Sequence, residues 1–298
     1  MTRKFFQRKR AISFWALIIL AVMLLGLGEY GIFIEPYNVV IRHVWVKDSG
    51  LGKALRGTVA VHLSDLHIRD IGKRERKVLA ILKALEPDLI FLTGDYMAWK
   101  ECNDFALTFL ARLETKRGVW AVMGDYDYSR SRQSCLFCHE TGSGKPNQSH
   151  PVRFLRNELV EIDIGRGSVW IGGIDLEGEL PFVSENSISH LEGTAPAIIL
   201  SHDPLNFELL DEDQDLLMLS GDTHGGQIPL PSWLWGLLGY EKCAKYNYGL
   251  FEKGKKKLFV SKGVGTSHFP IRILRRPEVV VLHFEEAEGR EHRAWSEN

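Results

Sequence analysis

The sequence predicts an α/β fold preceded by one apolar helix. Short apolar runs typical of buried strands alternate with amphipathic patterns typical of helices. Several of these runs end in a tight cluster of carboxylate and imidazole side chains, and the chain of 298 residues begins with a basic segment followed by an uncharged one. Together these observations predict one large domain with a polar site beyond the ends of several strands.

The N-terminal segment predicts a membrane anchor. Residues 1–10 are basic and lack acids, and residues 11–28 carry no charge, which gives about 27 Å of apolar helix. We predict a basic cytoplasmic tail at 1–10 and a transmembrane signal-anchor with its juxtamembrane segment at 11–34. The alternative is a cleaved export signal, with Gly26 and Gly28 near the cleavage point. Basic residues before a span stay in the cytoplasm, so the domain is expected on the periplasmic or extracellular side of the inner or cell membrane.

The composition is typical of a globular protein. Charged residues make up 25% of the chain and the net charge is −1, so no nucleic-acid partner is expected. No obligate protein partner is indicated either. The lysine-rich run 253–257 is predicted to be a solvated hairpin turn, and the isolated Cys102 and Cys243 are predicted to be small buried hydrophobes.

The elements expected after the anchor follow from hydrophobic periodicity. Apolar side chains at 78, 81, 82 and 85 recur with the spacing of an amphipathic helix that ends before Pro87. A second helix is expected near 105–113, a Gly-rich turn at 48–52 and an irregular loop at 129–151. Strands are expected at 37–46, 58–63, 89–92, 119–123, 169–174, 197–201, 216–220, 258–261 and 279–284. No linker divides 37–285, which we predict to be one domain, followed by a flexible tail at 286–298.

Seven acidic or imidazole side chains follow these strands closely, where open α/β sheets place their ligand sites. A single Asp-x-His or Gly-Asp after a strand is usually a turn or a helix cap, but five such units in one chain favour a divided metal site. Oxygen and nitrogen donors without cysteine suit Mn, Fe, Zn or Mg rather than structural zinc. Seven ligands suit two ions about 3.5–4 Å apart that activate water for attack on phosphorus. The predicted ligands are Asp65, His67, Asp95, Asp125, His202, Asp222 and His224.

The strings that carry these ligands occur in a characteristic order. They are LSDLHI at 63–68, LTGDY at 92–96, VMGDYDY at 122–128, ILSHDP at 199–204 and SGDTHGGQ at 220–227. With the closing segment 260–284, they make the chain resemble the calcineurin-like metallophosphoesterases, and within them the membrane-associated bacterial branch of YkuE-like and YaeI-like phosphodiesterases. The resemblance implies a four-layer sandwich, in which two mixed β-sheets are flanked by helices. It also implies a metal-dependent phosphoric ester hydrolase of phosphodiesterase or pyrophosphatase type.

The resemblance also implies a role for each ligand. Asp65, His67 and His224 match the ligands of the first metal, and Asp95 matches the carboxylate that bridges both. Asp125, His202 and Asp222 fall where the second metal is held. Two of these depart from the family pattern, since Asp125 stands for an asparagine and Asp222 for a histidine. The added negative charge favours Mn or Mg over Fe or Zn and makes the bound water a poorer acid.

A third departure concerns catalysis, for which Asp95, Tyr126 and His202 are the expected residues. Tyr126 stands where the family has a histidine that protonates the departing oxygen. A phenol, with its ordinary pKa near 10, is a weak proton donor at neutral pH. The site is therefore expected to favour good leaving groups, such as a pyrophosphate or an aryl phosphate. Arg272 is predicted to clamp a substrate phosphate, with an ordinary structural arginine as the alternative.

The string CLFCH in the loop at 129–151 has several interpretations. Cys135, Cys138 and His139 match the attachment pattern of covalent haem c. The two thiols are also consistent with a disulfide or redox-active pair, or with a small zinc site completed by His139 and His150. A segment without any of these functions is the remaining interpretation.

The favoured hypothesis is a membrane-anchored, dinuclear-metal phosphoesterase that hydrolyses a phosphodiester or pyrophosphate bond of a phosphorylated small molecule, such as a lipid-linked or nucleotide substrate. A UDP-diacylglucosamine pyrophosphate bond is one candidate, although that intermediate is cytoplasmic and the charge pattern places the domain outside. The apolar segment 233–238 is either a lip that reaches the membrane or a covered core segment. The alternative hypothesis is a non-catalytic or weakly catalytic, membrane-tethered redox or haem module on a phosphoesterase scaffold.

Overall fold

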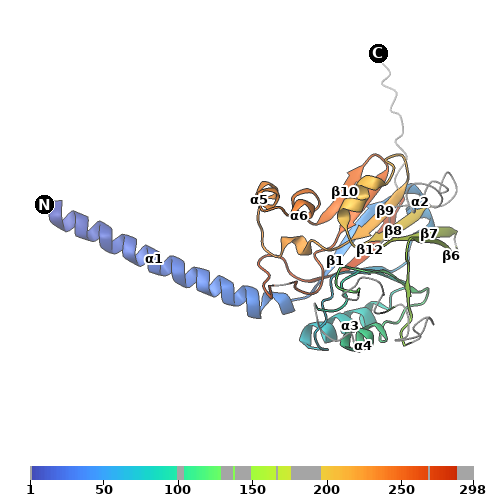
Figure 1. Ribbon diagram of the computed structural model, residues 1–298, viewed down its shortest axis with the longest axis horizontal. Helices are drawn as coiled ribbons and strands as arrows, with labels where there is room; N and C mark the ends of the chain where they lie inside the picture. The colour runs from blue at the N-terminus through green and yellow to red at the C-terminus, as the bar shows by residue number, and fades with distance from the viewer. Residues whose placement is uncertain are drawn as a thin grey trace, which may run out of the picture.

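Two mixed β-sheets pack face to face and helices cover their outer faces (Figure 1). The computed structural model describes residues 2–98, 104–128, 137, 149–165, 167–175, 196–267 and 269–286. Within these residues each sheet has six strands. The predicted α/β class and the four-layer sandwich are confirmed.

The first sheet has the order β1-β12-β2-β3-β4-β5. Its strands β2 to β5 run parallel, and β12 pairs parallel with β1 and antiparallel with β2. The bounds are β1 Val40–Lys47, β2 Ala60–Leu63, β3 Leu89–Thr93, β4 Val119–Val122, β5 Val152–Phe154 and β12 Glu278–Glu285.

The second sheet has the order β10-β11-β9-β8-β7-β6. Its four central strands are parallel, and each edge strand is antiparallel to its neighbour. The bounds are β6 Glu158–Asp163, β7 Ser168–Ile174, β8 Ala197–Ser201, β9 Leu216–Ser220, β10 Gly249–Lys253 and β11 Lys256–Val260.

The helical elements are α1 Thr2–Phe33, η1 Glu35–Tyr37, α2 Ser49–Leu55, α3 Lys73–Leu85, α4 Asp104–Leu110, η4 Pro204–Leu209, η5 His224–Gly226, α5 Ser232–Leu237 and α6 Glu241–Lys245. Figure 1 shows α1 projecting from the body of the molecule. The segment Phe14–Tyr37 is long and apolar enough to cross a membrane. It is therefore a candidate span, in agreement with the predicted anchor.

The first sheet has a separate hydrophobic core on each of its two faces, because successive side chains of a strand point to opposite faces. In β3, Ile90 and Leu92 face α3 and α4, whereas Leu89 and Phe91 face the second sheet. The layer between the sheets also receives Leu200, Leu219 and Phe259. A third core lies on the outer side of the second sheet, where Phe207 of η4 packs.

The structure corrects two local predictions. The turn predicted at 48–52 is wrong, because this segment begins α2: the Asp48 carboxylate accepts a hydrogen bond from Leu51 N at 2.8 Å, and Leu51 and Leu55 are buried. The hairpin turn predicted at 253–257 joins β10 to β11, but it is not fully solvated. Lys256 is buried, and its ammonium group donates to the carbonyls of Phe207 and Leu210.

The core between the sheets gives a stability test. Phe259 is fully buried there, with its ring edge-on to His62 at 6.0 Å between centroids. Phe259→Ala should lower the free energy of unfolding by about 3–5 kcal/mol, because it removes apolar contacts and leaves a cavity. Leu250→Ala, at the exposed position paired with Phe259, should cost about 1 kcal/mol or less. Urea unfolding of the full-length protein in detergent measures both, and equal losses would contradict this core.

Candidate metal centre

Five strands deliver the predicted ligands to one region of the molecule. Asp65 and His67 follow β2, Asp95 follows β3, Asp125 follows β4, His202 follows β8, and Asp222 and His224 follow β9. Because the strands are parallel neighbours within each sheet, their carboxyl ends lie together. The two sheets face each other through β3 and β8, so the loops from both sheets converge.

The side chains of all seven predicted ligands meet in three overlapping groups. Within each group, one ligand atom from each residue lies within 4.8 Å of the others. The first two groups share Asp65, and the last two share His202, so the three form one continuous cluster. The groups are Asp65 with His67 and His224, Asp65 with Asp95 and His202, and Asp125 with His202 and Asp222.

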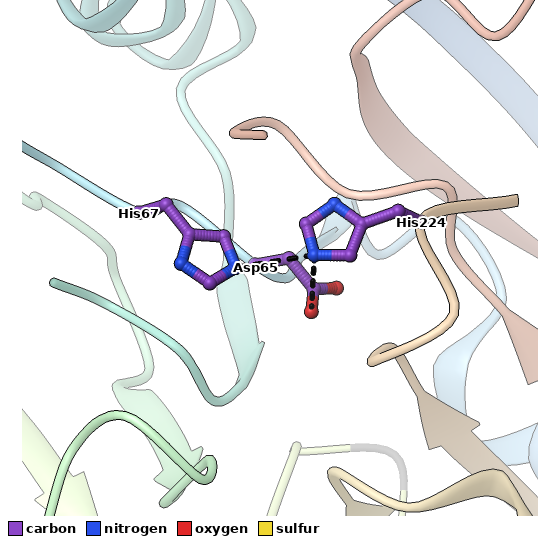
Figure 2. A group of neighbouring side chains, drawn as sticks. All are labelled: Asp65, His67 and His224. Atoms are coloured by element: carbon purple, nitrogen blue, oxygen red, sulfur yellow. Dashed lines mark hydrogen bonds and ion pairs between the residues drawn. The ribbon is translucent and has the colours of Figure 1, made fainter. Parts of the chain in front are cut away.

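The first group brings two imidazoles and a carboxylate together (Figure 2). His67 Nε2 lies 3.1 Å from His224 Nε2, and His224 Nε2 lies 3.6 Å from an oxygen of Asp65. Burial lowers the pKa of both histidines well below its ordinary value, and burial raises the pKa of Asp65 to about 6. Neutral imidazoles beside a carboxylate are the donor set of a metal such as Mn, Fe or Zn.

Asp95 lies between the two halves of the cluster. Its Oδ2 atom is 3.4 Å from His67 Nε2 and 3.5 Å from His202 Nε2. Burial raises the pKa of Asp95 well above its ordinary value, so the buried carboxylate needs nearby positive charge to stay ionised. This central position suits a carboxylate that bridges two ions.

His202 provides the sharpest test of whether a cation fits here. Its Nδ1 lies 2.7 Å from the Thr93 carbonyl, to which it donates, and its buried Nε2 has no hydrogen-bond partner among the described residues. That orphaned Nε2 faces oxygens of Asp95 at 3.5 Å and of Asp222 at 3.8 Å. Burial alone lowers the pKa of His202, but the surrounding carboxylates raise it to about 10. Nε2 and the carboxylates would hold a divalent ion, which would supply the same positive charge.

Lys242 of α6 is a charged neighbour that the sequence motifs do not reveal. Its ammonium group forms an ion pair with Asp222 and lies 2.9 Å from an oxygen of Asp203. Burial lowers the pKa of Lys242, but these carboxylates raise it above its ordinary value. The negative charge that Asp222 adds to the predicted second metal site is therefore partly offset by Lys242.

The loops that carry the ligands are strained. Non-glycine residues rarely adopt a positive φ, and such strain concentrates at functional sites. Five of the predicted ligands have φ between 42° and 70°: Asp65, His67, Asp95, Asp222 and His224. Holding these conformations requires the surrounding contacts to fix the backbone.

Asp127 fixes the backbone of the loops after β3 and β4, although the sequence motifs indicate no role for it. Its buried carboxylate accepts hydrogen bonds from the backbone N–H groups of Asp95 at 2.7 Å, Tyr96 at 2.8 Å and Gly124 at 2.8 Å. It thus joins the loops after β3 and β4. Burial raises the pKa of Asp127 to about 7. The signal for it was the second Asp of GDYDY, which follows the predicted ligand Asp125.

Tyr126, which the sequence predicts to be catalytic, lies beside the cluster. Its backbone N–H donates to Asp95 Oδ1 at 3.0 Å, and its ring meets His67 edge-on, with 4.8 Å between centroids. Burial and the adjacent carboxylates raise the pKa of Tyr126 to about 12. The phenol is therefore protonated at neutral pH and suited to donating a hydrogen bond.

Arg272 does not fit the prediction of a phosphate clamp, which needs an accessible guanidinium. The side chain is fully buried, and it donates to the carbonyls of Gly265 at 2.9 Å and Lys262 at 2.8 Å. Its Nη2 atom lies 3.3 Å from His224 Nδ1. Arg272 instead holds the loops around His224 in place, which is the structural alternative.

The thiol site predicted at Cys135, Cys138 and His139 lies outside the described residues, as do most of the loop 129–151, Cys102 and the tail beyond 286. His150 is described, and both of its ring nitrogens contact backbone groups, of Phe137 at 3.1 Å and Val152 at 3.3 Å. That arrangement does not favour His150 as a zinc ligand. Cys243 is a free, buried cysteine, as predicted.

The sandwich fold and the buried Asp–His cluster at the strand ends define a class, the metal-dependent phosphoric ester hydrolases. Residues 59–226 match the family model described as calcineurin-like phosphoesterase. The chain belongs to that family, and it is a hydrolase, which confirms the resemblance seen in the sequence.

Three curated proteins illustrate the similarity. The uncharacterized metallophosphoesterase YkuE of Bacillus subtilis is 26% identical over 86% of this chain and 89% of its own length. Phosphodiesterase YaeI of Escherichia coli is 28% identical over 74% of this chain and 79% of its own. The UDP-2,3-diacylglucosamine pyrophosphatase LpxG of Chlamydia muridarum is 25% identical over 76% of this chain and 84% of its own.

Close packing at Gly221 tests the geometry of the centre. A Cβ at this position would lie 1.8 Å from Ser64 Oγ and 2.4 Å from Asp65 Oδ2. Gly221→Ala should displace Asp65 and weaken Mn²⁺ binding by about 10- to 100-fold. The control is Gly236→Ala, where the nearest atom is 3.8 Å away. Calorimetric titration of chelator-treated protein with Mn²⁺ compares them, and wild-type affinity in both variants would refute the proposed site.

Proposed function

We propose that the protein is a membrane-anchored phosphoesterase with two divalent ions, and that it hydrolyses a phosphodiester or pyrophosphate bond. The observation that carries this proposal is the buried His202 Nε2, which faces Asp95 and Asp222 without a hydrogen-bond partner among the described residues. A buried, unpartnered nitrogen beside two carboxylates is costly unless a cation binds there.

Three residues are proposed to bind each ion, and Asp95 is proposed to bind both ions in addition. Asp65, His67 and His224 form the first set, and Asp125, His202 and Asp222 form the second. The ions supply Lewis acidity and an activated water when bound. The oxygen-rich second set favours Mn or Mg over Fe or Zn, even with the offset from Lys242.

The residues of the chain have further tasks in this reaction. The Thr93 carbonyl and the Asp127 carboxylate hold the His202 imidazole and the Asp95 loop in place, so the ligands need little rearrangement when the substrate arrives. Tyr126 is proposed to donate a hydrogen bond to the departing oxygen. Because it is a poor proton donor, bonds with good leaving groups are the favoured substrates.

The proposed substrate is an amphipathic phosphate compound. Two of the relatives are named as a phosphodiesterase and as a UDP-2,3-diacylglucosamine pyrophosphatase, and the candidate span 14–37 would keep the domain at a membrane. A lipid-linked or nucleotide substrate suits both facts, with a UDP-diacylglucosamine-type pyrophosphate bond as one candidate. The basic residues that precede the span support an outward-facing domain, where other lipid-linked phosphates would be the substrates.

The bridging carboxylate gives the direct test of activity. Asp95→Asn should reduce hydrolysis of bis-p-nitrophenyl phosphate in the presence of Mn²⁺ by about 10²–10³-fold, because it removes a negative charge at the centre of the cluster. The control is Asp213→Asn, at an exposed turn before β9. Initial rates of release of p-nitrophenol measure both. Undiminished turnover by Asp95→Asn would contradict a bridging role, and no turnover by the wild type under any divalent ion would contradict the proposed enzyme.

The leaving-group preference gives a second test. Tyr126→His introduces a group that titrates near neutral pH at the position where the family has histidine. We expect kcat for an alkyl phosphodiester to rise about tenfold relative to an aryl diester, since general acid catalysis matters most for the poorer leaving group. Rates with both substrates across pH 5–9 are compared with those of Tyr240→His, an exposed tyrosine outside the cluster. An unchanged rate ratio would remove Tyr126 from the departing oxygen.

A further inference from the structure

Exposed apolar side chains occur on two segments, α5 and the loop 269–274. Trp233 and Leu237 of α5 are 69% and 77% exposed, and Phe269 and Leu274, in the loop between β11 and β12, are 71% and 70% exposed. Together with the exposed Leu238, they form what we call the apolar rim. The rim is unusual because soluble surfaces rarely expose several large apolar side chains together.

The 269–274 part of the rim is fixed to the C-terminal end of α1. Arg272 N donates to the Gly31 carbonyl at 2.9 Å, and Glu35 accepts a hydrogen bond from Arg275 N. Gly31 itself leaves no space for a side chain, because a Cβ would lie 2.9 Å from Ile273. The loop therefore cannot move independently of the helix that is the candidate membrane span.

The α5 part of the rim is fixed to the metal centre. The buried indole of Trp235 packs on Gly226, where a Cβ would come within 2.5 Å of the ring. Gly226 lies two residues after His224. Ile273 N donates to the Gln227 carbonyl at 2.8 Å, which connects the loop 269–274 to the segment between η5 and α5. Figure 1 shows α5 on the side of the domain from which α1 projects.

The backbone at Leu274 adds a second kind of evidence. Its φ of 53° is unfavourable for leucine, and the side chain is nevertheless exposed. Arg276, two residues on, is exposed. Apolar side chains flanked by an exposed cation are typical of surfaces that lie in the headgroup region of a bilayer.

We propose that the apolar rim is a second membrane contact, which seats the domain on the bilayer that α1 spans. The proposal rests on the membrane-anchored function above and names its substrate more closely. With α5 inserted beside α1, the cluster around His224 lies at the headgroup level. A lipid-linked phosphate reaches the centre while its acyl chains stay in the bilayer, whereas a soluble phosphoester has no such advantage.

The experiment measures tryptophan emission from the full-length protein in nanodiscs, with and without brominated lipids. Bromine atoms on the acyl chains quench only tryptophan side chains that lie in the bilayer. Trp233→Phe should remove part of the quenched emission, as should Trp15→Phe in the candidate span. The matched control is Trp45→Phe, an exposed tryptophan on β1, which should remove only unquenched emission. If Trp233→Phe also removes only unquenched emission, the rim lies in water and the proposal is overturned.

A second measurement addresses the other occupant of such a surface, which is a second copy of the chain. If the detergent-solubilised wild type is a dimer and Trp233→Ser makes it a monomer, the rim is an interface between copies and the proposal is overturned. Quenching needs no catalysis, so a protein that fails to hydrolyse bis-p-nitrophenyl phosphate can still place Trp233 in the bilayer. Failure of the proposed function and failure of the membrane contact are thereby distinguished.

Discussion

The structure depends on the burial of several ionisable side chains around one point. Asp65, Asp95 and His202 are removed from water where the two sheets meet, and an isolated charge in such a place costs several kcal/mol. The apolar layers on both sides exclude the solvent that would otherwise stabilise these charges. Nearby positive charge must therefore balance the buried carboxylates, and this requirement connects the fold to the proposed chemistry.

The loops around the cluster hold the ligand residues in place through side-chain to backbone hydrogen bonds, in backbone conformations with a positive φ. The Asp127 carboxylate accepts hydrogen bonds from three backbone N–H groups in two loops, and Arg272 donates to two backbone carbonyls next to His224. Such contacts keep the ligand residues in conformations that they would not adopt alone. The support around the ligands is thus as much a part of the centre as the ligands themselves.

The sequence predicted the parts of the fold whose signals are local. Buried parallel strands such as β3 and β8 read as continuous apolar runs, and their ends carry the Asp and His residues, so the convergence of the cluster could be anticipated. The short edge strands β5 and β6 are polar or mixed and were not predicted. Lys242 was missed because its pairing with Asp222 arises from the packing of α6. The buried position of Arg272 likewise depends on loops that only the tertiary structure brings together.

The junction between Gly31 and Arg272 has a practical consequence for preparing this protein without its hydrophobic helix. A chain that begins after residue 35 loses both acceptors, the Gly31 carbonyl and the Glu35 carboxylate, and leaves the amides of Arg272 and Arg275 unpaired. Because Arg272 also contacts His224, measurements on such a shortened domain would describe a loosened ligand cluster rather than the native one. Removal of only the first 28 residues would preserve both acceptors.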